Sequence, residues 1–206
     1  MNGGFAHRRI KWANTLVASA IALWTLALAA GFYFIERHAN GSGQPASPPE
    51  VMAASLSAPT PSPKHRLLLF AHPQCPCTMA TLEALDRLMA TSRDQIDVSV
   101  YVWRPTAKTE KWAETALWER ASRIPGARVI LDPDGAEIRR YGARTSGQVL
   151  LYSPRGELEF SGGITPSRGH EGDCAGRDAI TDALRGVHTT RTAPVFGCAL
   201  QESTES

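Results

Sequence analysis

One stretch of this chain decides its fold: residues 67–89, which read LLLFAHPQCPCTMATLEALDRLM. The apolar run over 67–71 predicts a buried strand, and the apolar residues after position 78 recur at helical spacing. Cys75 and Cys77 lie between the predicted strand and the predicted helix. A helix N-terminus stabilises a nearby anion, so we expect the thiolate form to be favoured there. Because a thiolate is both a nucleophile and a soft-metal ligand, the motif indicates disulfide exchange or metal binding.

Residues 65–200 continue with alternating strand and helix patterns. We expect strands over 66–71, 97–103, 128–131, 148–152 and 157–160, and helices over 78–90, 110–123, 137–141 and 177–184. This order predicts an α/β domain with a mixed sheet and helices on both of its faces. The 206 residues of the chain leave room for one such domain and a further segment.

The further segment lies at the N-terminus. Arg8, Arg9 and Lys11 precede residues 12–35, which carry no charge and would span about 36 Å as a helix. That length is enough to cross a hydrocarbon core of about 30 Å. Basic residues before such a span predict a cytoplasmic N-terminus. We therefore expect residues 1–11 in the cytoplasm, a single-pass anchor in the inner (cytoplasmic) membrane, and the domain in the periplasm or outside the cell. A cleaved signal peptide is the alternative, and it exports the domain equally.

Composition changes again over residues 36–64, which are rich in Pro, Ser, Ala and Gly. A segment of this kind cannot bury a core and predicts a disordered tether that leads to the domain at 65–200. Residues 201–206 read as a polar tail. The net charge is +2, with Lys and Arg scattered among Asp and Glu, so nothing in the pattern indicates nucleic-acid binding.

The order of elements, with two cysteines between the first strand and its helix, resembles the thioredoxin-like superfamily. The likeness covers residues 65–184 and is greatest to the membrane-tethered thiol-disulfide oxidoreductases of bacteria, of RedB-like and TlpA- or ResA-like type. The family's motif is usually Cys-x-x-Cys, whereas this chain has Cys-x-Cys, with Gln74 in place of the usual first cysteine. The resemblance also places Ser146 where the family has a cis-proline that shapes its substrate groove.

The resemblance implies disulfide exchange with other exported proteins that carry pairs of cysteines, without a cofactor. Cys75 lies nearer the loop, so we expect it to attack; Cys77 falls in the first helical turn and would resolve the mixed disulfide. A disulfide across one residue strains its geometry, which predicts an easily reduced couple. We expect His72, Pro76 and Ser146 to border the substrate groove.

Two other functions stay open on the sequence. A copper chaperone of the exported Sco type would hold Cu(I) with Cys75 and Cys77, joined by His72 and His170. His72 fits equally well as a strand-end histidine bonded to the backbone, and His170 as a polar loop residue. A non-catalytic interaction domain would keep the fold and use its thiols for structure alone.

The other two cysteines, Cys174 and Cys198, predict a structural disulfide, which is common in exported proteins. Such a bridge closes a loop of about 24 residues, for which chain entropy gives roughly 3 kcal/mol. The alternative is that one of these two cysteines relays electrons from Cys75 and Cys77.

Overall fold

The computed structural model describes residues 3–52, 62–187 and 191–200. It divides into two compact units, one up to Asn40 and one from Gly41 onward. The first unit is a single helix, α1 (Gly3–Ala39). Its stretch Asn14–Ala39 has a mean hydropathy of 1.9 and no buried residues, so it is long and apolar enough to cross a membrane. An N-terminal signal sequence has the same properties.

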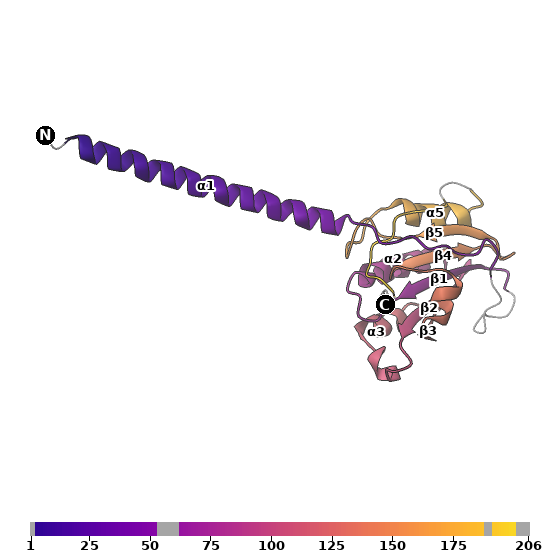
Figure 1. Cartoon of the computed structure of the whole chain (residues 1–206). Helices are drawn as coiled ribbons and strands as arrows, with labels where there is room; N and C mark the ends of the chain where they lie inside the picture. Colours follow the sequence, from indigo (N-terminus) through magenta and orange to yellow (C-terminus); the bar gives the residue numbers. More distant parts are fainter. Residues whose placement is uncertain (1–2, 53–61, 188–190, 201–206) are drawn as a thin grey trace. The chain divides into compact units, whose positions relative to one another are not determined.

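The second unit is built on a mixed five-stranded sheet. Its strands are β1 (His65–Ala71), β2 (Ile96–Arg104), β3 (Ala127–Pro133), β4 (Gln148–Tyr152) and β5 (Leu158–Gly162). Figure 1 shows them side by side in the order β3-β2-β1-β4-β5. β1, β2 and β3 run parallel, whereas β4 and β5 run antiparallel to their neighbours. β1 is therefore the central strand, with Leu69 paired to both Val100 and Val149.

Side chains of the central strand alternate between two apolar layers, as the pleat of a strand requires. Leu67 and Leu69 face a layer with α2 (Thr78–Ser92), α3 (Ala116–Ser122) and α5 (Ala175–Leu184). Leu68 and Phe70 face the opposite layer, to which α4 (Ala136–Arg140) contributes. This arrangement confirms the α/β sheet with helices on both faces that the sequence predicts, and it explains why five consecutive apolar residues occur in β1.

The helix predicted over 110–123 is interrupted in the structure. A short 3-10 helix, η1 (Glu110–Trp112), is followed by an extended residue, Thr115, before α3 begins. The hydroxyl of Thr115 donates a hydrogen bond to the carbonyl of Pro73 at 2.7 Å. The single helix is therefore wrong, because a contact with the loop before Cys75 holds Thr115 in a conformation that no helix allows.

The first part of the predicted tether lies on the folded unit. Backbone hydrogen bonds join Gly43 N–H to the carbonyl of Val195 (2.7 Å), Ser47 N–H to Gly142 (3.1 Å), Met52 N–H to Gly156 (2.7 Å) and Leu158 N–H to Glu50 (2.8 Å). The hydroxyl of Tyr152 also donates to the carbonyl of Pro49. Residues 41–52 therefore differ from a free tether, because their backbone groups find partners on the domain. Residues 53–61 and the predicted tail at 201–206 lie outside the described residues.

Candidate functional site

Cys75 lies in the turn that leads from β1 into α2. Its backbone N–H donates to the carbonyl of His72 at 3.0 Å, and Cys77 is the residue immediately before the first residue of α2. Only 2% of Cys75 is exposed, whereas Pro76 is exposed and Cys77 is half-buried. The two thiols are thus at the N-terminal end of a 15-residue helix, where the sequence predicts them.

Hydrogen-bond donors surround the sulfur of Cys75. The backbone N–H of Cys198 donates to its Sγ at 3.4 Å, and the hydroxyl and N–H of Thr78 lie within hydrogen-bonding reach. Burial disfavours the thiolate, but the hydrogen bonds from Thr78 and Cys198 outweigh it and lower the pKa of Cys75 below its ordinary value. The pKa of Cys75 thus shifts in the direction expected at a helix N-terminus, but the hydrogen-bond donors that shift it belong to Thr78 and Cys198.

The pKa of the second thiol of the motif, Cys77, shifts in the opposite direction. Burial and the negative charge of Cys75 raise the pKa of Cys77 above its ordinary value, although the guanidinium of Arg168 opposes this effect. Cys77 also lies within hydrogen-bonding reach of both Cys75 and Arg168. The motif therefore pairs one thiol whose pKa is lowered, Cys75, with one whose pKa is raised, Cys77.

A third thiol reaches Cys75 from the end of the chain. The side chain of Cys198 lies within hydrogen-bonding reach of Cys75, and burial together with this contact and its charge raises the pKa of Cys198 to about 12. All four cysteines are free thiols in the structure, so the disulfide predicted between Cys174 and Cys198 is not formed there. Cys198 instead faces Cys75, because the backbone of its own segment pairs with residues 144–146.

Ser146 connects the motif to that segment. Its buried hydroxyl accepts a hydrogen bond from the N–H of His72 at 2.8 Å and lies 2.7 Å from the hydroxyl of Thr78. Its own N–H donates to the carbonyl of Cys198 at 2.8 Å. No cis peptide bond occurs at Ser146 or at any other described residue. Ser146 thus lies next to the motif, as the resemblance implies, and its backbone is paired with the chain's own C-terminal segment.

His72 has an aromatic environment. Its ring centroid lies 5.1 Å from that of Trp103 and 5.9 Å from that of Trp112. Its Nδ1 accepts a hydrogen bond from the N–H of Gln74 at 3.1 Å. These contacts are those of a strand-end histidine bonded to the backbone, which was one of the two sequence-based interpretations.

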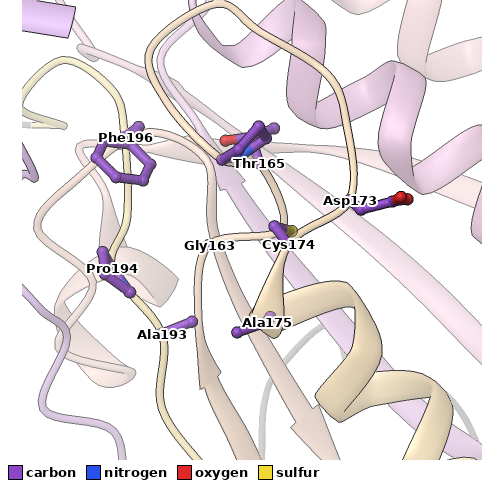
Figure 2. Close-up of a pocket in the computed structure, with 10 residues that line it drawn as sticks. Gly163, Thr165, Asp173, Cys174, Ala175, Ala193, Pro194 and Phe196 are labelled. Carbon is purple, nitrogen blue, oxygen red and sulfur yellow. The ribbon is translucent and has the colours of Figure 1, made fainter. Parts of the chain in front are cut away.

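The remaining predicted residues lie in other surroundings. Cys174 immediately precedes α5 and lines a pocket of about 250 Å³. Figure 2 shows that Cys174 and Thr165 border this pocket together with Pro194 and Phe196 of the C-terminal segment. His170 is exposed, with its Nδ1 2.7 Å from the carbonyl of Arg168.

The proposed copper ligands do not converge. Among the residues that the structure describes, no group of three or more His, Cys, Asp and Glu side chains is close enough to hold a metal ion. The set of Cys75, Cys77, His72 and His170 is therefore not brought together as a metal site.

Two residues of the site were missed by sequence reasoning. Thr78 belongs to the predicted helix, and only its place directly after the motif could have drawn attention to it. Arg168 lies far along the chain from Cys77, in a loop with no motif, so no sequence signal connects the two. Its guanidinium also donates to the carbonyls of Gly41 (3.1 Å) and Gly197 (2.5 Å).

The topology, with the two cysteines between the central strand and α2, is the one that the sequence resemblance implied. The fold is thioredoxin-like. Two solved structures are similar over most of the chain. An uncharacterized conserved protein from Geobacillus kaustophilus has a TM-score of 0.56 and 15% identity, covering 81% of this chain and 95% of that chain. A hypothetical protein from Sinorhizobium meliloti 1021 has a TM-score of 0.54 and 19% identity, covering 80% and 96%.

A third solved structure is more distant. A secreted Mycobacterium tuberculosis disulfide oxidoreductase has a TM-score of 0.43 and 16% identity, covering 62% of this chain and 84% of that chain, and no conclusion rests on it. No family model matches the chain. No curated protein matches it either. At these identities the likenesses concern the fold alone.

Proposed function

We propose that this chain exchanges thiols and disulfides with exported proteins that carry pairs of cysteines, and that Cys75 is its nucleophile. The observation that carries this proposal is the sulfur of Cys75, which accepts hydrogen bonds from Thr78 and Cys198 that lower its pKa. A lowered pKa increases the thiolate fraction at neutral pH, and the thiolate is the form that attacks a disulfide.

In the reductive direction, the Cys75 thiolate attacks one sulfur of a client disulfide. The bond between the two client sulfurs breaks, one client thiolate leaves, and the other sulfur is bound to Cys75 as a mixed disulfide. A second thiol of this chain then attacks Cys75, and the client departs as a dithiol with two more electrons. Cys77 lies within hydrogen-bonding reach of Cys75 and is one candidate for this second thiol.

We further propose that α1 anchors the chain in the inner membrane, with the folded unit on the far side from the cytoplasm. The apolar stretch at Asn14–Ala39 and the basic residues Arg8, Arg9 and Lys11 before it support this orientation. An oxidising compartment suits the chemistry, because disulfides persist there. Protease treatment of intact cells with permeabilised outer envelopes should digest the folded unit, whereas protection of that unit would contradict the orientation.

The exchange activity can be tested on the full chain in detergent micelles with a fluorescent peptide disulfide as substrate. We expect Cys75→Ser to slow the exchange, because the thiol with the lowered pKa is lost. Cys174→Ser is the matched control, since Cys174 lies at the start of α5 and makes no hydrogen bond to the motif that the structure records. An exchange rate for Cys75→Ser equal to that of the wild type would reject the proposal.

A further inference from the structure

The last described residues of the chain form a C-terminal strap, residues 195–200, that lies against the loop at 144–146. The N–H of Ser146 donates to the carbonyl of Cys198 at 2.8 Å, and the N–H of Leu200 donates to the carbonyl of Arg144 at 2.9 Å. An antiparallel bridge joins Thr145 to Ala199 between these two bonds. The strap is therefore held in a defined register, and that register fixes where the side chain of Cys198 lies.

Both ends of the C-terminal strap are secured as well. Leu200 is fully buried in the apolar layer that contains Phe70. At the other end, the buried Val195 accepts a hydrogen bond from Gly43 N–H at 2.7 Å. A strap anchored at both ends holds the residue between them, Cys198, over the motif.

At Gly197 the C-terminal strap packs directly against the backbone of Ser146. A Cβ atom on Gly197 would lie 1.9 Å from the carbonyl oxygen of Ser146, so only glycine allows this approach. The carbonyl of Gly197 also accepts a hydrogen bond from Arg168 at 2.5 Å. The same guanidinium lies within hydrogen-bonding reach of Cys77, so one cation connects the strap to the motif.

The contact itself joins two thiols from opposite ends of the folded unit. Cys198 presents both its N–H, at 3.4 Å, and its side chain to the sulfur of Cys75. Cys75 is buried, whereas Cys198 is exposed. A client that approaches the closed site therefore meets Cys198 before it meets Cys75.

We propose that Cys198 is the disulfide partner of Cys75, so that the working redox couple of this chain is Cys75–Cys198 and oxidation locks the C-terminal strap over the nucleophile. This inference rests on the proposed exchange function and names its second thiol. Cys77 then acts as a neighbour of the couple, and it need not form a disulfide across a single residue, which strains the bridge.

The step balances with the client as the only co-reactant. After Cys75 forms the mixed disulfide, the thiolate of Cys198 attacks the sulfur of Cys75. A Cys75–Cys198 bond forms, the bond between Cys75 and the client breaks, and the second client sulfur leaves as a thiolate that takes up the proton that Cys198 released. Two electrons pass from this chain to the client, and the reverse sequence oxidises a client dithiol.

The charge on Cys75 affects when Cys198 can react. Burial is the largest cause of the raised pKa of Cys198, and while Cys75 is a thiolate its hydrogen bond and its charge raise that pKa further. In the mixed disulfide the sulfur of Cys75 carries no charge, so this effect on Cys198 is removed and its thiolate fraction rises. Cys198 is thus a better nucleophile after Cys75 has reacted than before, which reduces its competition for the client.

Disulfide mapping of the full chain in detergent micelles tests the inference. The protein is equilibrated in glutathione buffers, its free thiols are alkylated, and it is cleaved with trypsin. Cleavage after Arg66 and Arg87 gives one peptide with Cys75 and Cys77, and cleavage after Arg191 gives another with Cys198. We expect the oxidised protein to yield these two peptides joined by a disulfide, in the wild type and in Cys77→Ser.

The equilibrium constant with glutathione separates the possible results. We expect the control Cys174→Ser to keep the wild-type constant, and Cys198→Ser to change it by about tenfold or more. A Cys75–Cys77 bridge in the wild type, with an unchanged constant in Cys198→Ser, would overturn the inference and leave the proposed function standing. Failure of Cys75 to form a reversible disulfide with any thiol would overturn both.

Discussion

The backbone N–H of Cys198 donates a hydrogen bond to the Sγ of Cys75 at 3.4 Å, across 123 positions of the chain. The bond has two effects on the nucleophile. It stabilises the thiolate, which helps to lower the pKa of Cys75. It also places a second cysteine directly over the first, so activation and coverage of the nucleophile come from the same residue.

Thr78→Val should reduce the reactivity of Cys75 at neutral pH. The substitution removes a hydroxyl that lowers the pKa of Cys75, so that pKa should rise toward its ordinary value. The measurement is the rate of Cys75 alkylation as a function of pH, with Cys75 followed by peptide mass spectrometry. We expect the midpoint of the profile to move to higher pH.

Thr91→Val is the matched control for that measurement. Thr91 lies on the same helix, but its hydroxyl donates to the carbonyl of Leu88, away from the motif. Its pH profile should equal that of the wild type. Equal midpoints for Thr78→Val and Thr91→Val would show that Thr78 does not stabilise the thiolate.

Cys75→Ser should make Cys198 more reactive. In the wild type, burial and the contact with Cys75 raise the pKa of Cys198 to about 12, so little of it is ionised near neutral pH. A serine hydroxyl stays neutral, so the pKa of Cys198 should fall and its alkylation near pH 8 should accelerate. Cys174 in the same sample serves as the internal reference. A slower or unchanged rate at Cys198 would contradict the coupling between the two thiols.

Gly197→Ala should loosen the C-terminal strap. The new Cβ would lie 1.9 Å from the carbonyl oxygen of Ser146, and such overpacking costs about 1–3 kcal/mol. If that cost falls on strap closure, the open population rises about 5- to 150-fold. Hydrogen exchange at the amides of Ser146 and Leu200 measures this population and should accelerate accordingly.

Gly186→Ala controls for the loss of a glycine. Gly186 has a positive φ of 73° and follows α5, and no atom of the described residues is near enough to contact a new Cβ. The substitution should strain its own turn but leave exchange at Ser146 and Leu200 unchanged. Similar acceleration in both variants would mean that general destabilisation, and not the strap, controls exchange at these amides.

Leu82→Ala should destabilise the folded unit by about 2–5 kcal/mol, because Leu82 is fully buried between α2 and the sheet. Urea unfolding of the reduced protein measures this loss. Leu184→Ala at the end of α5 is the comparison, since Leu184 is only partly buried and should lose less. A loss at Leu82 no larger than that at Leu184 would argue against the packing of α2 described above.

Much of the fold could be predicted because its signals are local. The apolar run in β1, the helical spacing after Cys77 and the turn residues between strands each act over a few positions, and together they gave the mixed sheet with helices on both faces. The break before α3 could not be predicted in this way. The contact of Thr115 with the carbonyl of Pro73 outweighs the helical preference of residues 110–123, and it exists only once the chain has folded.

The candidate site could likewise be predicted only in part. The sequence by itself determined that Cys75 and Cys77 lie at the start of a helix, because strand and helix patterns flank them directly. Only the tertiary structure decided that Cys198 faces Cys75 and that Arg168 reaches Cys77. Those partners depend on a backbone register between the C-terminal strap and residues 144–146, which are separated in sequence but paired in space. No local pattern encodes such a pairing, because it is selected by the burial of Leu200 and by the backbone hydrogen bonds that the two segments can form only together.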